Sequence, residues 1–288
     1  MLILTAQASW AAETASFLNI GVGARGLGMG GAYTAMADDV SSLYWNSAGL
    51  VKLDKREFTA SHAEMFESTR LDFLAYAHPT SQGTFAAGLT YLSHGKIDGR
   101  DSVGRQTSGY DASDAAVSLG YARKLEIADL GAAFKYLRSH IGGAEAQGLA
   151  VDIGAKRTFE SVNVGAALRN LGPGLKFQDQ RNDLPLRLAV GAVYNFAGGH
   201  ATAAELVNGP RGAGTDAAFG GEYQAVKNLY LRLGYTTQTA ITGGSGFDAA
   251  RGLTMGLGFR NDKWNIDYAV LPSGELGRTH KFTLGTRF

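Results

Sequence analysis

The chain contains no cysteine, only five prolines among its 288 residues, and no long apolar run. Without cysteine, the protein has no disulfide framework, no thiol nucleophile and no cysteine-ligated zinc. No segment after the first residues approaches the roughly 18 consecutive apolar residues of a membrane helix. If this chain spans a membrane, it therefore does so with strands that close into a barrel.

An excess of charge of one sign is also missing, because 27 lysines and arginines balance 26 aspartates and glutamates. Basic residues are not concentrated in any segment, so we expect no nucleic acid as partner. Glycine, by contrast, occurs 40 times, about twice its usual share of roughly 7%. The glycines follow no collagen period. They therefore indicate strands that bend and that pack closely against another part of the structure.

The first residues have the pattern that ends a signal peptide. A short apolar stretch leads to Ser9, Trp10 and Ala11, which place small residues at the two positions that a signal peptidase requires. We predict cleavage after Ala11. No basic region precedes this stretch, so either translation starts upstream or the segment is an ordinary apolar N-terminus.

From residue 56 onward, apolar residues alternate with small or polar ones, which is the period of a β-strand with two different faces. The pattern is clearest from Pro185 to Ala197 and at residues 149–156, 229–236 and 253–260. A soluble sandwich alternates in the same way. Alternation alone therefore does not decide whether the apolar face packs into a dry protein core or faces lipid.

The connections between the strands favour the membrane barrel. We count about fourteen candidate strands, and short connections alternate with longer ones, as in bacterial outer-membrane barrels. The short ones lie near residues 79–83, 124–126, 159–161, 198–200, 225–228 and 261–262, and the long ones near residues 95–110, 141–147, 172–184, 208–215 and 237–249. The sequence therefore predicts an all-β fold, a closed antiparallel transmembrane β-barrel in the bacterial outer membrane.

The chain ends on an aromatic residue, Phe288, which shares a face with Phe282 and Leu284. This ending resembles the signal through which the barrel assembly machinery recognises outer-membrane proteins. The alternative is a plain edge strand at the C-terminus.

Residues 13–55 do not alternate, and they contain a formal match to the dinucleotide-binding pattern G-x-G-x-x-G at residues 21–26. That pattern binds pyrophosphate only between a strand and a helix of a βαβ unit, and no repeated βα pattern follows here. We instead expect the glycines to allow close backbone packing and Ala32 to Leu43 to form a short helix. Such a segment would be a plug inside the barrel.

Three motifs in this region carry a family resemblance. Residues 23–32 (GARGLGMGGA), 37–39 (ADD) and 43–50 (LYWNSAGL) resemble the N-terminal hatch of the PorV/PorQ group, within the long-chain fatty acid transporters of the FadL type. The usual Asn-Pro-Ala is Asn46-Ser47-Ala48 here, which loosens a turn. The motifs at residues 148–155, 164–172, 231–235 and 267–270 are similar in the same order, so the resemblance covers residues 20–288. It implies a fourteen-stranded barrel with a short helical hatch in the lumen.

The predicted organisation is therefore a signal peptide at residues 1–11, a hatch at residues 12–55 and the barrel at residues 56–288. The candidate hatch residues are Arg25, Gly28, Gly31, Asp38, Asp39 and Asn46. Strand parity places charged residues in the lumen, namely Asp129, Lys135, Asp152, Arg169, Arg187, Glu222, Arg232, Arg260, Asp267, Lys281 and Arg287. Because isolated charges in a narrow lumen are costly, we expect most of them to be paired or hydrated. We also expect Asp38 and Asp39 to pair with luminal arginines and hold the plug.

We predict neither an enzyme nor a bound cofactor or metal. The six histidines lie far apart, with no metal-binding spacing, and no G-x-S-x-G motif is present. An outer-membrane phospholipase with a Ser-His pair remains an alternative, because such a pair leaves little trace in a sequence.

Two classes of function remain open, and in both the expected partners are outer-membrane lipid and the barrel assembly machinery. Resemblance to the fatty acid transporters implies passive transport of a small hydrophobic ligand, with residues 95–110 and 172–184 near its entrance. Resemblance to PorV implies a secretion-system accessory that binds exported proteins at the cell surface. The longest loop, about sixteen residues and polar, is small for holding a protein domain. We therefore expect transport of hydrophobic molecules.

Overall fold

The computed structural model describes residues 13–65, 68–177, 180–211, 213–237, 252–272 and 277–288. The predicted signal peptide at residues 1–11 lies outside the described residues. Among the residues that are described, no helix is long and apolar enough to cross a membrane.

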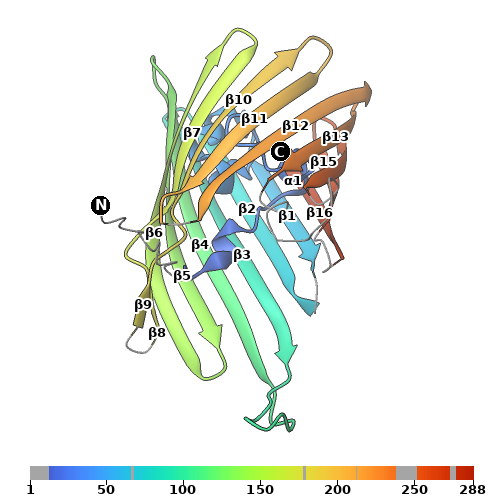
Figure 1. The fold of residues 1–288 in the computed structure, drawn as a ribbon. Coiled ribbons are helices and arrows are strands. Elements are labelled where there is room, and N and C mark those ends of the chain that lie inside the picture. Colours follow the sequence, from blue (N-terminus) through green and yellow to red (C-terminus); the bar gives the residue numbers. More distant parts are fainter. Residues whose placement is uncertain (1–12, 66–67, 178–179, 212, 238–251, 273–276) are drawn as a thin grey trace, which may run out of the picture.

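The described strands form a closed antiparallel barrel of fourteen strands, as predicted (Figure 1). Strand order follows the chain, with β1 hydrogen-bonded to β16 and β7 to β10. The barrel strands are β1 (Glu57–Glu64), β2 (Arg70–Thr80), β3 (Gly83–Ile97), β4 (Tyr110–Lys124), β5 (Asp129–Ile141), β6 (Ala144–Phe159), β7 (Val162–Leu171), β10 (Arg187–Phe196), β11 (His200–Gly209), β12 (Gly214–Val226), β13 (Leu229–Thr236), β14 (Leu253–Arg260), β15 (Trp264–Pro272) and β16 (Arg278–Arg287). The remaining two, β8 (Leu175–Phe177) and β9 (Gln180–Asn182), form a separate hairpin.

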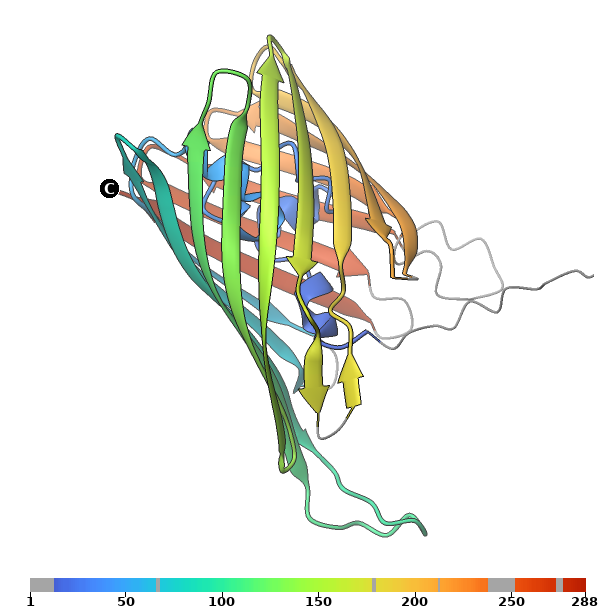
Figure 2. The same ribbon diagram turned by 90° about the vertical axis from the view of Figure 1, so that its left-hand side faces the viewer.

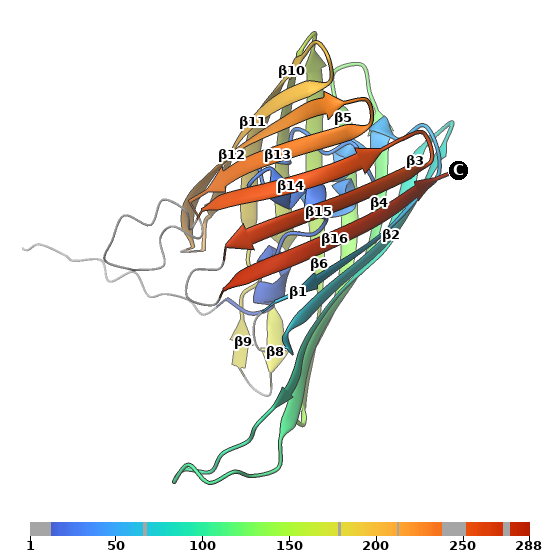
Figure 3. The ribbon, with the colours of Figure 1, turned by 90° about the vertical axis from the view of Figure 1, so that its right-hand side faces the viewer.

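The two ends of the barrel differ, and we call them the turn end and the loop end. The turn end carries short connections such as residues 81–82, 160–161 and 227–228, together with the C-terminal Phe288. At the loop end, residues 98–109 continue the β3–β4 hairpin well beyond the other strands (Figures 2 and 3). The predicted difference between the two ends is present. The expected long loop near residues 208–215 comprises only the residues between Gly209 and Gly214, and the one at residues 237–249 lies, from residue 238 on, outside the described residues. Two further connections need correction.

The first correction concerns residues 141–147, which were expected to form a long loop. β5 and β6 are instead joined at residues 142–143, where Gly142 has a φ of 60°. The second concerns residues 172–184, which hold the β8–β9 hairpin rather than an irregular loop. Gly142 and Gly143 form the tight β5–β6 turn, which composition alone did not distinguish from a loop.

The strands present two faces of different chemistry. β5 alternates buried and exposed residues almost without interruption, and its outward Phe134 is 45% exposed. Outward Leu206 on β11 and Leu233 on β13 are 57% and 54% exposed. A closed barrel therefore carries its large apolar side chains on the outside and its small or polar ones inside.

Residues 13–53, which we call the luminal segment, run through the interior of the barrel (Figures 1 and 2). The segment enters at the loop end, where the Thr14 amide donates to the Asp183 carbonyl, and leaves at the turn end next to β1. Its helical turns are η1 (Ser16–Asn19), α1 (Ala24–Gly28), α2 (Ser42–Trp45) and η2 (Ser47–Lys52). Its buried side chains, including Tyr33, Leu43 and Leu50, form the main apolar core with inward residues of the wall.

The expected helix from Ala32 to Leu43 is wrong. Helix α1 ends at Gly28 and α2 begins only at Ser42, and between them the chain makes turns. Positive φ angles at Gly30 and Gly31 end the helical path. Wall carboxylates then accept from the Thr34 and Val40 amides, which satisfies these amides without a helix.

Candidate functional site

Glycines on the inner face of the wall let the luminal segment touch the wall backbone. A Cβ atom built on any of them would lie 2.0 to 3.2 Å from an atom of the segment. These wall glycines are Gly88, Gly120, Gly131, Gly154, Gly165, Gly220, Gly234 and Gly256. Real Cβ atoms do not approach other heavy atoms so closely, so larger residues would displace the segment. The glycine richness of the chain thus has a structural cause.

Buried side chains of the wall also bind the backbone of the segment. Glu205 accepts from the Thr34 amide at 2.7 Å and from its hydroxyl at 2.8 Å. Lys281 donates to the Gly21 carbonyl. Asn46, in the segment itself, donates to the Ala155 carbonyl at 3.2 Å and accepts from the Ala48 amide, which caps η2. These bonds fix the segment at several levels of the lumen.

An ion network joins the segment to the wall on one side. The Arg25 guanidinium donates to both oxygens of Glu222 at 3.0 Å. Glu222 also accepts from Arg232 at 2.7 Å, and Arg232 donates to Asp267 at 2.6 Å. The side chain of Arg232 is 0% exposed, so this network is shielded from water.

Asp38 and Asp39 were expected to pair with luminal arginines, and this expectation is corrected by the structure. Their arginine partner is Arg25 of the luminal segment itself, which contacts Asp38 closely and lies 3.7 Å from Asp39. The wall group that Arg25 reaches is a carboxylate, Glu222. The sequence analysis identified the charged residues, but it expected carboxylates of the segment to meet arginines of the wall. In the structure an arginine of the segment meets a carboxylate of the wall.

The surroundings of Arg25 keep it charged. Burial opposes its charge, but Asp38 and Glu222 raise the pKa of the guanidinium above its usual value. Burial likewise opposes the charge of Asp38, yet Arg25 holds the pKa of that carboxyl below its usual value. Burial raises the pKa of Tyr33, whose hydroxyl donates to Asp39 at 2.7 Å. The cluster therefore holds an ionised pair next to a neutral phenol.

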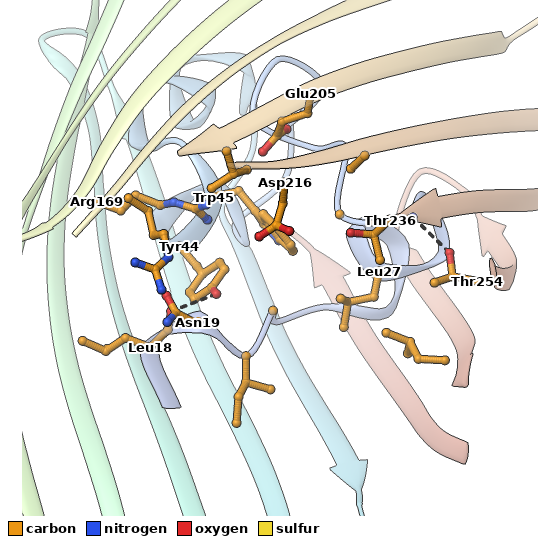
Figure 4. Close-up of a pocket in the computed structure, with 18 of the residues that line it drawn as sticks. Leu18, Asn19, Leu27, Tyr44, Trp45, Arg169, Glu205, Asp216, Thr236 and Thr254 are labelled. Atoms are coloured by element: carbon orange, nitrogen blue, oxygen red, sulfur yellow. Dashed lines mark hydrogen bonds between the residues drawn. The ribbon is translucent and has the colours of Figure 1, made fainter. Parts of the chain in front are cut away.

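A cavity of about 240 Å³ remains between the luminal segment and the wall, on the side of the loop end (Figure 4). Apolar groups on the segment side include Leu18, Leu27 and Trp45. Strands β7 and β10 to β16 supply the remaining walls, with Arg169, Arg187, Glu205, Asp216 and Lys281 as the charged residues. The luminal segment therefore occupies the barrel but leaves a cavity in the lumen.

Two of the cations at this cavity have no carboxylate partner among the described residues. Arg169 is 8% exposed, its guanidinium lies 5.6 Å from the centre of the Tyr44 ring and 5.7 Å from Trp45, and its Nε has no hydrogen-bond partner. Lys281 is 2% exposed and donates to a backbone carbonyl. Figure 4 shows Arg169 beside Tyr44 and Trp45 at the edge of the cavity. Arg169 therefore has hydrogen-bonding capacity left for an anionic ligand.

Tyr44 completes this side of the cavity. Its hydroxyl donates to the Leu18 carbonyl at 3.0 Å, and burial raises the pKa of the phenol to about 12. Tyr44 therefore stays neutral at physiological pH and presents a ring face to Arg169.

The other predicted residues lie in the lumen, but not at one site. Asp152 pairs with Lys135 at 2.6 Å, and Arg187 pairs with Glu13 at 2.7 Å. Arg260 lies near the turn end, 4.0 Å from Glu222 and 5.1 Å from the Tyr230 ring centre. Gly28 contacts the wall at Gly256. Gly31 has a φ of 84° and lies next to the Trp45 ring.

Sequence reasoning did not single out Glu205, Tyr44 or Trp45 as site residues. Glu205 follows Ala201 and Ala203 at the spacing of an inward face, so strand parity contains the signal. No sequence signal marks Leu27 as a cavity residue, because α1 was not predicted.

The fold and the site define a class, a closed fourteen-stranded β-barrel with its own N-terminal segment packed in the lumen. The chain belongs to the family described as "Uncharacterised protein family (UPF0164)", whose model matches residues 5–185. No curated protein matches the chain.

Solved structures with a similar fold include two toluene transporters. TbuX of Ralstonia pickettii is 14% identical with a TM-score of 0.67, and the match covers 93% of this chain and 98% of that one. TodX of Pseudomonas putida is 15% identical with a TM-score of 0.63, covering 93% and 96%. The chain therefore has the same barrel fold as these two transporters.

Proposed function

We propose that the protein lies in the outer membrane of a bacterium and lets small hydrophobic molecules with an acidic head group, of the fatty-acid type, cross it passively. The observation that carries this proposal is the cavity of about 240 Å³, with its apolar lining and the buried basic residues Arg169 and Lys281. An apolar tail gains by leaving water, and a carboxylate gains by meeting a buried guanidinium whose Nε has no hydrogen-bond partner.

The outer face of the barrel supports the membrane location. Large apolar side chains such as Phe85, Leu119 and Phe219 are more than half exposed in the isolated chain. In water such a surface would drive aggregation, whereas in a bilayer it faces lipid. The short-turn end then faces the periplasm and the loop end the outside.

The solved structures that share this fold support transport of hydrophobic molecules, because TbuX and TodX are described as toluene transporters. In this chain the buried basic residues Arg169 and Lys281 distinguish the cavity from one built for a hydrocarbon alone. We therefore expect an eight-carbon acid to bind better than a neutral molecule of the same length.

The test compares octanoate, octanol and octylamine on detergent-purified protein, with quenching of Trp45 as the signal and Trp45→Phe as the blank. Octanoate should bind at least about tenfold more tightly than octanol, since a hydrogen bond to a charged group contributes about 1.5–3 kcal/mol. In Arg169→Gln the advantage of octanoate should disappear while octanol binding stays the same. Tightest binding of octylamine, or no quenching by any of the three, would refute the proposal.

A second candidate function is that of a secretion accessory similar to PorV, which binds exported proteins at the cell surface. The observation that favours it is the β3–β4 hairpin, which projects beyond the barrel with Val103 71% exposed near its tip (Figure 2). Shortening residues 98–109 to a two-residue turn separates the two functions. Loss of co-purifying exported proteins with unchanged octanoate binding would favour the accessory role.

A further inference from the structure

The apolar band on the outer face of the barrel becomes narrow where the barrel closes. On β5, four outward residues in succession, from Leu130 to Tyr136, are apolar. On β1 only Phe58 and Ala60 are, and the next outward residue is His62. At about 3.3 Å per residue, these stretches span about 20 Å and about 7 Å along the strand. Since the apolar band of an outer-membrane barrel is about 25 Å tall, β1 covers only a small part of it.

The two strands that flank β1 have the same short apolar stretch, and Figure 3 shows β16, β1 and β2 together. From the turn end toward the loop end, the outward apolar residues of β2 end at Leu74 and those of β16 end at Phe282. Beyond them, outward polar side chains of the three strands gather at the loop end. We call them the seam patch, which consists of His62, Glu64, Arg70, Asp72, Arg278 and His280.

The acidic residues of the seam patch have basic neighbours within it. The Nδ1 atom of His62 lies 2.6 Å from a carboxylate oxygen of Asp72. Glu64 is the strand partner of Arg70 on one side and of His280 on the other. Both carboxylates are therefore placed among groups that can neutralise them.

The two arginines of the seam patch are not engaged in this way. Among the described residues, no hydrogen bond or ion pair joins the guanidinium of Arg70 or Arg278 to another group. Arg138, an outward arginine of β5, by contrast donates to Glu145 at 2.7 Å. Arg70 and Arg278 therefore keep their hydrogen-bond donors available for a ligand.

The surroundings of these arginines follow from the proposed membrane location, on which this inference rests. The loop end faces outside, so the seam patch lies on the side of the outer leaflet. Charged side chains on the lipid-facing surface are costly in the middle of a bilayer and tolerated near its head groups. A bilayer next to a short apolar stretch becomes thinner, which brings its head groups to the polar side chains.

We propose that the seam patch binds the phosphate of a lipid head group in the outer leaflet, through Arg70 and Arg278. A guanidinium binds phosphate oxygens with two parallel hydrogen bonds. The acyl chains lie along the short apolar stretches of β16, β1 and β2. A second copy of the chain fits this surface less well, because the centre of a protein interface is depleted of charged residues.

The test compares two lipids that differ only in the phosphate, dioleoyl phosphatidic acid and dioleoylglycerol, by native mass spectrometry of the detergent-purified protein. The unsubstituted protein should retain phosphatidic acid and release dioleoylglycerol. In the double variant Arg70→Gln/Arg278→Gln, retention of phosphatidic acid should fall about fivefold for each arginine removed. Equal retention of the two lipids, or unchanged retention in the double variant, would overturn the site.

The matched control is Arg105→Gln with Arg138→Gln, which also removes two positive charges toward the loop end but outside the seam patch. It should retain phosphatidic acid as the unsubstituted protein does, and an equal loss in the control would show an effect of net charge alone. Inorganic phosphate is the third probe. Phosphate adducts that disappear in the double variant would assign the patch to a free anion, and a dimer that disappears there would assign it to a second copy. Either result would overturn the lipid site.

Octanoate quenching of Trp45 separates this inference from the proposed function. The double variant Arg70→Gln/Arg278→Gln should keep its octanoate binding, and Arg169→Gln should keep its phosphatidic acid. Normal octanoate binding with unchanged lipid retention in the double variant would contradict the seam patch alone. Absence of octanoate binding, with lipid retention lost in the double variant, would contradict the uptake function alone. A protein that stays dissolved without detergent would contradict the membrane location and both sites with it.

Discussion

The two halves of the luminal segment are attached to the barrel by different means. Around η2, Asn46 to Ala48 press directly on the wall glycines Gly131 and Gly154, and Leu43 fills the space above Gly88 and Gly120. Around α1, Gly28, Met29 and Gly30 also press on wall glycines, and hydroxyls and an ion pair hold the chain in addition. Close packing loses its energy steeply with displacement, and a buried ion pair is costly to break. The η2 half is therefore held mainly by packing, and the α1 half by packing together with buried polar contacts.

The largest expected effect comes from removing the close fit of η2. Gly154→Val would bring its first side-chain carbon to within 2.0 Å of Asn46 Oδ1. Overpacking of this kind costs about 1–3 kcal/mol, so the barrel should unfold at a lower temperature, as seen by gel mobility of heated samples.

Gly221→Ala is the matched control, since a Cβ at this strand glycine meets nothing within 4 Å. Its unfolding temperature should equal that of the unsubstituted protein. If Gly154→Val behaves like the control, the fit around η2 does not hold the segment.

The next effect concerns the pair of Arg25 with Glu222. Arg25→Gln removes the charge that joins Asp38 to Glu222, so the unfolding temperature should fall. The fall should be smaller than in Gly154→Val, because Glu222 keeps Arg232 as a partner. Arg56→Gln, an exposed arginine just before β1, is the control and should not change the unfolding temperature. An unchanged unfolding temperature in Arg25→Gln would contradict the account.

Acid should act on the same contact. Arg25 holds the pKa of Asp38 below its usual value, so the stabilisation from this pair is present above about pH 4 and is lost as the pH falls below that. The unfolding temperature should therefore fall on acidification, and Asp38→Asn should have a lower unfolding temperature already at pH 7 with a smaller acid response. An identical acid response in both proteins would show that another group titrates.

The smallest effect is expected at Lys52, at the end of η2. Its ammonium lies 3.6 Å from Asp129 and its side chain is 37% exposed, so the pair is screened by water. Lys52→Ala should not shift the unfolding temperature. A clear loss of stability would mean that charge also matters in the half that we assign to packing.

The difference between the strands and the luminal segment explains how much of the structure could be predicted from the sequence. Strand parity predicted the barrel, because each strand repeats one simple pattern and its inward charges, such as Asp152 and Arg232, follow from it. The luminal segment has no period, and its conformation depends on partners far along the chain. Thr34 and Val40 bind Glu205 and Glu57 through their amides, which no local propensity reveals.

The cavity shows the same limit. Arg169 was recognised as luminal from its parity, but its lack of a carboxylate partner depends on where Tyr44 and Trp45 come to lie. Which luminal charges form ion pairs depends on the three-dimensional structure of the closed barrel. The resemblance of the hatch motifs pointed to a plug, whereas only the structure shows the space that the plug leaves.

The most direct test of the central claim is a crystal structure of the protein with an octanoate that carries bromine at its last carbon. The account predicts anomalous bromine density in the cavity between Leu27 and Trp45, with the carboxylate within hydrogen-bonding distance of Arg169. Bromine density found on the outer face of the barrel, with the cavity closed or filled by protein, would contradict it.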